Sequence, residues 1–113
     1  MPADHLSGHP DSVTAVGPED DASVTGVGPA ETAAIWNSVC DWYRMGTTPA
    51  IQICLRRGGG IVLNRAIGHG WGTAPAGGPD TARVPITVDT PFCGFSTAKG
   101  VAAVVMAMLI EQG

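Results

Sequence analysis

The sequence predicts an α+β fold in which an antiparallel hairpin packs against helices. Two observations carry this prediction: two runs of alternating apolar residues flank a glycine-rich stretch, and apolar residues at helical spacing occur on either side of them. The chain has 113 residues, which bounds it to one domain at most. Its hydrophobic content of 44% is enough to form a core, and its 16 glycines and 9 prolines indicate many loops.

Residues 1–30 are predicted to be a disordered acidic tail. They show no apolar periodicity and carry almost no large apolar side chains among their Pro, Gly, Ser and Thr residues. A segment of this composition buries too little apolar surface to offset the entropy lost on ordering. Its carboxylates are Asp4, Asp11, Glu19, Asp20 and Asp21.

A helix is predicted over residues 31–44. Glu31 in the first turn and Arg44 in the last turn both suit the helix dipole, and Gly46 supplies a stop. Ile35, Val39 and Trp42 recur at helical spacing, flanked by Trp36, Cys40 and Tyr43. An aromatic stripe of this kind is typical of a face that packs in a core.

A β-hairpin is predicted from residues 50–55 and 61–67, in which alternate residues are apolar. The glycines at 58–60 permit the positive φ angles of a tight antiparallel turn. Residues 68–90 are predicted to be a loop because Gly, Ala and Pro follow one another closely. No G-x-G-x-x-G that opens a helix and no G-K-[ST] occurs, so a phosphate cradle is not expected.

The last predicted element is a helix over residues 96–112. It is apolar on every side, which is the pattern of a helix covered all round. One hairpin and one other helix are too little to cover it. We therefore expect that most of the structure that packs on this helix lies outside this sequence.

Composition excludes several functional classes. The net charge of −4 argues against nucleic-acid binding. A secretory signal is not expected, because no Lys or Arg precedes Arg44 and the first thirty residues lack an apolar run. The apolar run 101–110 is too short to span a bilayer, so no membrane association is expected. The cysteines Cys40, Cys54 and Cys93 are odd in number and lack C-x-x-C spacing, which favours free thiols in the cytoplasm and argues against zinc.

Ser96 and Lys99 form the pattern S-x-x-K at the start of the last predicted helix. Residues i and i+3 of a helix are neighbours, so the amine can reach the hydroxyl. The first backbone N–H groups of the helix can stabilise an oxyanion. Burial beside Phe92, Phe95 and the apolar helix would favour a neutral amine that acts as a general base.

The residues around this pattern strengthen it. Residues 85–99 resemble the segment P-[VM]-T-x-D-T-x-F-x-x-x-S-x-x-K of β-lactamase-related serine hydrolases, which include class C β-lactamases, similar esterases and D-alanyl-D-alanine peptidases. The upstream order of helix, strand, glycine turn and strand is also similar to that family. The resemblance covers residues 31–113 and implies a partial β-lactamase-like (penicillin-binding-protein-like) fold, in which the last helix carries the nucleophile.

By this resemblance Ser96 is the acyl-forming nucleophile and Lys99 its activating partner, without cofactor or metal. The substrate would be a small ester, amide or β-lactam. The family also uses a Tyr-x-Asn or Ser-x-Asn element and a Lys-Thr-Gly or His-x-Gly strand, both of which follow the nucleophile. Neither occurs here, Tyr43 lies upstream, and Phe95 stands where the family usually has a small residue. The resemblance therefore implies an incomplete N-terminal portion, inactive by itself, with a partner chain as one source of the remainder.

Three alternatives stay open. Ser96 can be a helix N-cap and Lys99 an exposed helical lysine. Residues 94–98 approximate the G-x-S-x-G elbow of α/β-hydrolases, with residues 69–72 as their oxyanion loop, although Pro91 and Gly94 disrupt the strand that such an elbow needs. Finally, the chain can be a non-catalytic remnant or subunit that pairs with a partner through its apolar helix.

Overall fold

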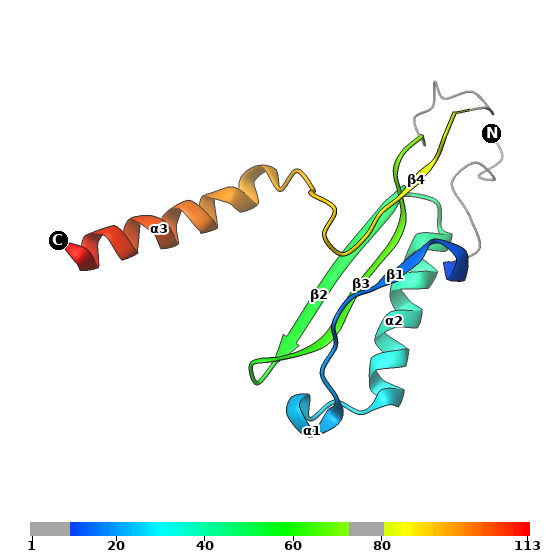
Figure 1. The fold of residues 1–113 in the computed structure, drawn as a ribbon, viewed down its shortest axis with the longest axis horizontal. Coiled ribbons are helices and arrows are strands. Elements are labelled where there is room, and N and C mark those ends of the chain that lie inside the picture. The colour runs from blue at the N-terminus through cyan, green and yellow to red at the C-terminus, as the bar shows by residue number, and fades with distance from the viewer. Residues whose placement is uncertain (1–9, 73–80) are drawn as a thin grey trace.

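The computed structural model describes residues 10–72 and 81–113. It confirms an α+β arrangement with an antiparallel sheet (Figure 1). The elements, in chain order, are η2 (Pro10–Val13), β1 (Thr14–Val16), α1 (Ala22–Thr25), α2 (Pro29–Arg44), β2 (Ala50–Arg57), β3 (Gly60–Trp71), β4 (Val84–Pro85), η3 (Phe95–Thr97) and α3 (Ala98–Gln112).

The sheet is organised around β3, which pairs antiparallel with β1, β2 and β4. The predicted hairpin is confirmed, with Ile51 opposite Ile67 and a turn in which Gly58 and Gly59 have positive φ. Strand β3 extends further than its alternating apolar residues indicate, because pairing with β4 carries it to Trp71. The predicted loop is therefore wrong for residues 68–71 and 84–85, while residues 73–80 lie outside the described part of the chain.

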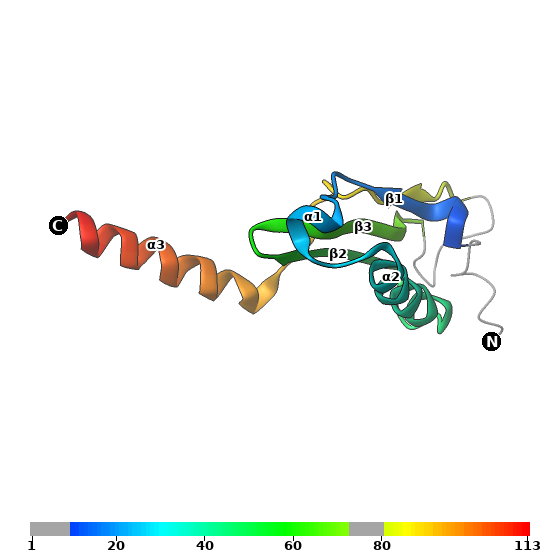
Figure 2. The ribbon, with the colours of Figure 1, turned by 90° about the horizontal axis from the view of Figure 1, so that it is seen from below.

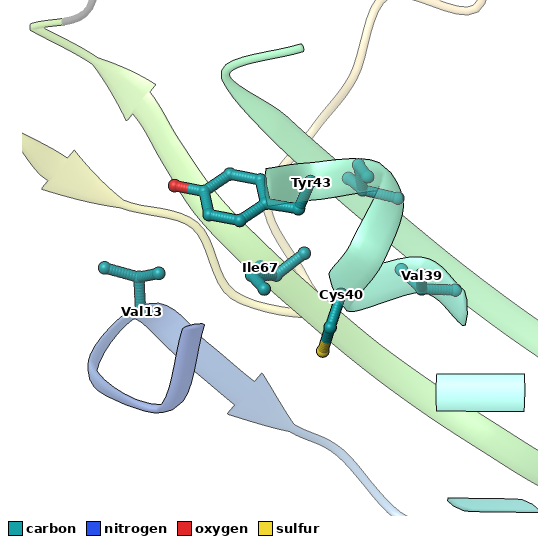
Figure 3. Close-up of a cluster of buried hydrophobic side chains, with 6 residues drawn as sticks. Val13, Val39, Cys40, Tyr43 and Ile67 are labelled. Atoms are coloured by element: carbon teal, nitrogen blue, oxygen red, sulfur yellow. The ribbon is translucent and has the colours of Figure 1, made fainter. Parts of the chain in front are cut away.

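Helix α2 packs on one face of this sheet and confirms the helix predicted at residues 31–44. Its buried residues Val39, Cys40 and Tyr43 meet Ile51 and Ile67 of the hairpin (Figure 3). The buried face is rotated from the expected stripe. Trp42 stays half exposed, whereas Trp36, Val39, Cys40 and Tyr43 follow the i, i+3, i+4, i+7 spacing of a core-facing helix.

The segment before α2 is folded, so the predicted disordered tail is wrong for residues 10–30; residues 1–9 lie outside the described part. β1 adds a strand to β3, and Val13 of η2 joins the core. The carboxylates order this segment. Asp20 Oδ2 accepts from Ile61 N at 2.7 Å, and Asp21 caps α1 by accepting from Ser23 N at 2.8 Å.

Glu19 accepts three hydrogen bonds in this segment. Its two carboxylate oxygens accept from Arg65 Nε at 2.7 Å and Nη2 at 2.8 Å, and Oε1 also accepts from Asn64 N at 2.9 Å. The Arg65 guanidinium lies 5.4 Å from the centre of the Trp36 ring. The hydrogen bond from Arg65 is the main reason that the pKa of Glu19 is lowered, with the Asn64 N–H adding to it.

Helix α3 stands apart from the sheet and from α2 (Figures 1 and 2). All of its residues are exposed, and within the described residues its only extensive contact is with η3. The predicted apolar helix is therefore confirmed, starting at Ala98 rather than at residue 96. Valine, methionine, leucine and isoleucine side chains lie on every side of it without cover.

We expect Glu19→Gln to lower the free energy of unfolding of the sheet by about 2 kcal/mol, because a charge-assisted, bidentate pair is lost. The pKa of Glu19 is lowered in the folded chain, so its contribution is present above its ordinary value of 4.5 and is lost as pH falls through the lowered value. Urea unfolding at pH 7 and pH 3 measures both effects. If Glu19→Gln lowers the free energy of unfolding as much at pH 3 as at pH 7, the stabilisation does not come from the ionised Glu19 carboxylate.

We expect Gly68→Ala to destabilise the chain by about 3 kcal/mol. Gly68 has a φ of 105°, and a Cβ there would collide with Pro49 O and lie 2.9 Å from Tyr43 Cε2. Gly59→Ala is the matched control, since Gly59 also has a positive φ, 86°, but no atom within 4 Å of a Cβ. The control should lose only about 1 kcal/mol. Equal losses in urea unfolding would show that close packing at Gly68 is unimportant.

Candidate functional site

Ser96 lies in η3, the 3₁₀ turn that leads directly into α3. The turn closes through a 2.9 Å hydrogen bond from Thr97 N to Gly94 O. Phe95 has a φ of 44°, in the left-handed region, and it is the only non-glycine residue with a positive φ in the described part of the chain. A bulky residue in that region is a genuine outlier. It turns the backbone immediately before Ser96.

Lys99 lies in the first turn of α3, three residues after Ser96, and both residues are exposed. The structure thus places both predicted site residues at one helix start. No hydrogen bond joins their side chains within the described residues. The expected burial of Lys99 is wrong for this chain, because Phe92 and Phe95 are 51% and 83% exposed and no described residue packs over α3.

The segment that leads from β4 to Ser96 is held on the sheet. Ile86 is buried, and its N–H donates to Gly68 O at 3.0 Å. The following turn is fastened to β2 by the Gln52 side-chain amide. Sequence reasoning missed this contact, because a polar residue on a strand gives no signal of its partner 35 residues away.

Beside this segment lies an open hollow of about 380 Å³. It is lined by Pro49, Ala50, His69, Gly70, Thr90, Pro91, Phe92 and Cys93. His69 is 8% exposed, and its Nδ1 has no hydrogen-bond partner among residues 10–72 and 81–113. Burial, with a smaller effect of Arg83, lowers the pKa of His69 and so favours the neutral imidazole. The S-x-x-K interpretation assigns no role to this histidine.

The structure bears on two of the alternative readings of Ser96. Helix α3 has Thr97 at its N-cap and no side-chain capping hydrogen bond, so Ser96 is not an N-cap. The other half of that alternative agrees with the structure, because Lys99 is an exposed lysine within α3. The α/β-hydrolase alternative fails on three counts. The sheet is antiparallel throughout the described residues, and the segment directly before Ser96 is not a strand. Residues 69–71, moreover, belong to β3 and do not form a loop.

Tyr43 does not belong to the site. It is 2% exposed in the core beneath α2, and burial raises the pKa of its hydroxyl. Cys40 is buried in the same core, while the free thiols of Cys54 and Cys93 are exposed. In residues 10–72 and 81–113 no group of three or more His, Cys, Asp or Glu side chains could hold a metal ion.

By length and composition alone, the 18 residues Phe95–Gln112, with a mean hydropathy of 1.2, would also suffice to cross a membrane. The stretch is wholly exposed, so its apolar surface is available to a protein or a lipid partner.

Comparison of the chain with protein-family models, with curated protein sequences and with solved structures gives no match.

Proposed function

We propose that this chain is the N-terminal portion of a serine hydrolase that cleaves a small ester, amide or β-lactam through an acyl-Ser96 intermediate. The observation that carries the proposal is the arrangement of Ser96 and Lys99 at one helix start, after the left-handed turn at Phe95. Such backbone outliers cluster at functional sites. Support also comes from the resemblance of residues 85–99 to the nucleophile segment of β-lactamase-related hydrolases. The proposed enzyme acts in the cytoplasm and uses no cofactor.

In the proposed chemistry, this chain supplies the reacting groups of the acylation step, which are the Ser96 hydroxyl and the Lys99 amine. The Lys99 amine accepts the proton of the Ser96 hydroxyl, and the Ser96 oxygen bonds to the acyl carbon of the substrate. The bond from that carbon to the leaving oxygen or nitrogen then breaks, and the leaving group takes up the proton. Water later attacks the acyl-serine, which releases the acid and restores Ser96. Backbone N–H groups at the start of α3 are available to stabilise the oxyanion.

The exposure of this site explains why the chain should be a poor catalyst alone. Electrostatic stabilisation and general-base activation both gain strength where water is excluded. Around Ser96 and Lys99 no described residue provides such cover. The same structure that would bury α3 would therefore also enclose the site, and it can come from further sequence of the same protein or from a partner chain.

We expect a fluorophosphonate to form an adduct with Ser96 in the full chain, while steady turnover of a p-nitrophenyl ester remains close to background. Ser96→Ala should give no adduct. Lys99→Met keeps the side-chain length without the amine and should slow labelling about a hundredfold, the scale of a general base. Mass spectrometry of peptides locates the adduct.

Thr97→Ala is the matched control for this experiment, because it removes the neighbouring hydroxyl, which makes no capping hydrogen bond. It should label at the rate of the unmodified chain. The proposal fails if Ser96 gains no adduct, or if Lys99→Met labels as fast as the parent chain.

A second candidate function is a non-catalytic subunit that binds a partner chain through α3. The observation that favours it is the complete exposure of an apolar helix, which a soluble protein normally covers. The two candidates share this surface and differ in whether Ser96 reacts.

We expect the purified chain to self-associate through α3, because burial of apolar surface stabilises association. Val105→Glu should shift its elution in size-exclusion chromatography with light scattering toward the monomer. Val24→Glu is the matched control: Val24 on α1 is 55% exposed and Val105 49%, but only Val105 lies on α3. A monodisperse parent monomer would contradict the expectation. If the chain floats with neutral liposomes, α3 binds a membrane, and the partner-chain candidate is contradicted.

A further inference from the structure

A single side chain fastens the segment that leads to Ser96. Gln52 Nε2 lies 3.0 Å from Thr87 O, 2.7 Å from Val88 O and 3.2 Å from Thr90 O. A side-chain amide has two N–H donors, so these three carbonyls share them. The contact joins residues at least 35 positions apart and is therefore a tertiary one.

The position of Gln52 on β2 explains why its side chain reaches the turn at residues 87–90. Ile51 belongs to the core cluster beneath α2 and Ile53 packs against that cluster, and successive side chains of a strand point to opposite faces. Gln52 therefore points to the face of the sheet that α2 leaves open. The turn at residues 87–90 crosses this face, where Val88 also lies against Gly17, at 2.9 Å from a Cβ placed there.

The turn is arranged to receive one donor group. Thr87 N donates to Thr90 Oγ1 at 2.8 Å, and Thr90 N donates to Thr87 O at 3.2 Å. This closure brings the carbonyls of three nearby residues toward the same point. Replacing the amide by an apolar side chain would leave them without the donor that holds them to β2.

The contact is also the last tertiary hydrogen bond before the nucleophile in the described chain. Residues 91–95 are all exposed, and η3 is closed only by its own local hydrogen bond. The placement of Ser96 relative to the sheet therefore depends on where the turn at residues 87–90 is fixed.

We propose that Gln52 is a positioning residue for the Ser96 nucleophile, acting through the turn at residues 87–90. The inference rests on the function proposed above for Ser96. Gln52 touches neither substrate nor Ser96. Its amide holds the turn from which residues 91–95 lead to Ser96. The reactivity of an oriented nucleophile is sensitive to small displacements.

The test compares Gln52→Met, which keeps the length of the side chain without a donor, with Gln52→Lys, which restores N–H donors. Amide hydrogen exchange in the full chain measures how firmly residues 87–90 are held, and fluorophosphonate labelling measures the reactivity of Ser96. In Gln52→Met we expect exchange of the Thr87 and Thr90 amides to rise about tenfold and Ser96 labelling to slow about tenfold. Gln52→Lys should return both rates toward those of the parent.

Arg57→Met is the matched control on the same strand, because Arg57 Nη1 donates to Gly26 O at 3.1 Å at the other end of β2. It should leave the exchange of residues 87–90 unchanged. Unchanged exchange in Gln52→Met would overturn the proposal, and so would a Gln52→Lys chain that behaves like Gln52→Met. Labelling that stays fast while exchange rises would also overturn it. If exchange responds as expected but no chain labels at Ser96, the proposed hydrolase function fails, while Gln52 remains the residue that holds the turn.

Discussion

The backbone pairing of β3 is the constraint on which the rest of the structure depends. This strand is hydrogen-bonded to β1, β2 and β4, and its residue Ile67 is fully buried beneath α2. The pairing with β1 orders the acidic N-terminal segment, the pairing with β2 builds the face on which α2 packs, and the pairing with β4 returns the chain toward the open face. Each of these elements is too short or too polar to be stable without that central strand.

The sheet determines the position of the candidate site, and the start of helix α3 supplies its chemistry. Ile86 and the turn that follows bind the chain to the sheet, and after residue 90 the chain leaves the core entirely. Ser96 and Lys99 therefore lie where an ordered body meets an uncovered apolar helix. The exposure of α3 and the exposure of the site have one cause, which is the lack of a second layer on this side of the described chain. A partner surface that covers α3 would at the same time lower the polarity around the serine and lysine.

Helix α2 and the hairpin could be predicted from the sequence because their signals are local. Apolar residues repeat with the periods of a helix and of a strand, and glycines stand at the turn. The error over residues 10–30 has the opposite origin. Glu19 is an ordinary acidic residue in the sequence. Only its hydrogen bond from Arg65, 46 positions later, lets it hold the N-terminal segment on the sheet. Trp42 shows the same limit within a helix, since both aromatic stripes fit a helical period and only the docking of α2 chose the one that includes Tyr43.

The sequence by itself determined the α+β class, the helix before the hairpin, the apolar helix at the end and the S-x-x-K pair at its start. These follow from periodicity and from spacings of three or four residues, which a chain carries wherever it folds. Tertiary structure decided which carboxylates order the N-terminal segment, how far β3 extends and where Gln52 finds its carbonyls. It also decided that Ser96 and Lys99 lie exposed. Those features depend on groups that are distant in sequence and come into contact only when the sheet forms. Whether a residue is buried or exposed depends on the same long-range contacts.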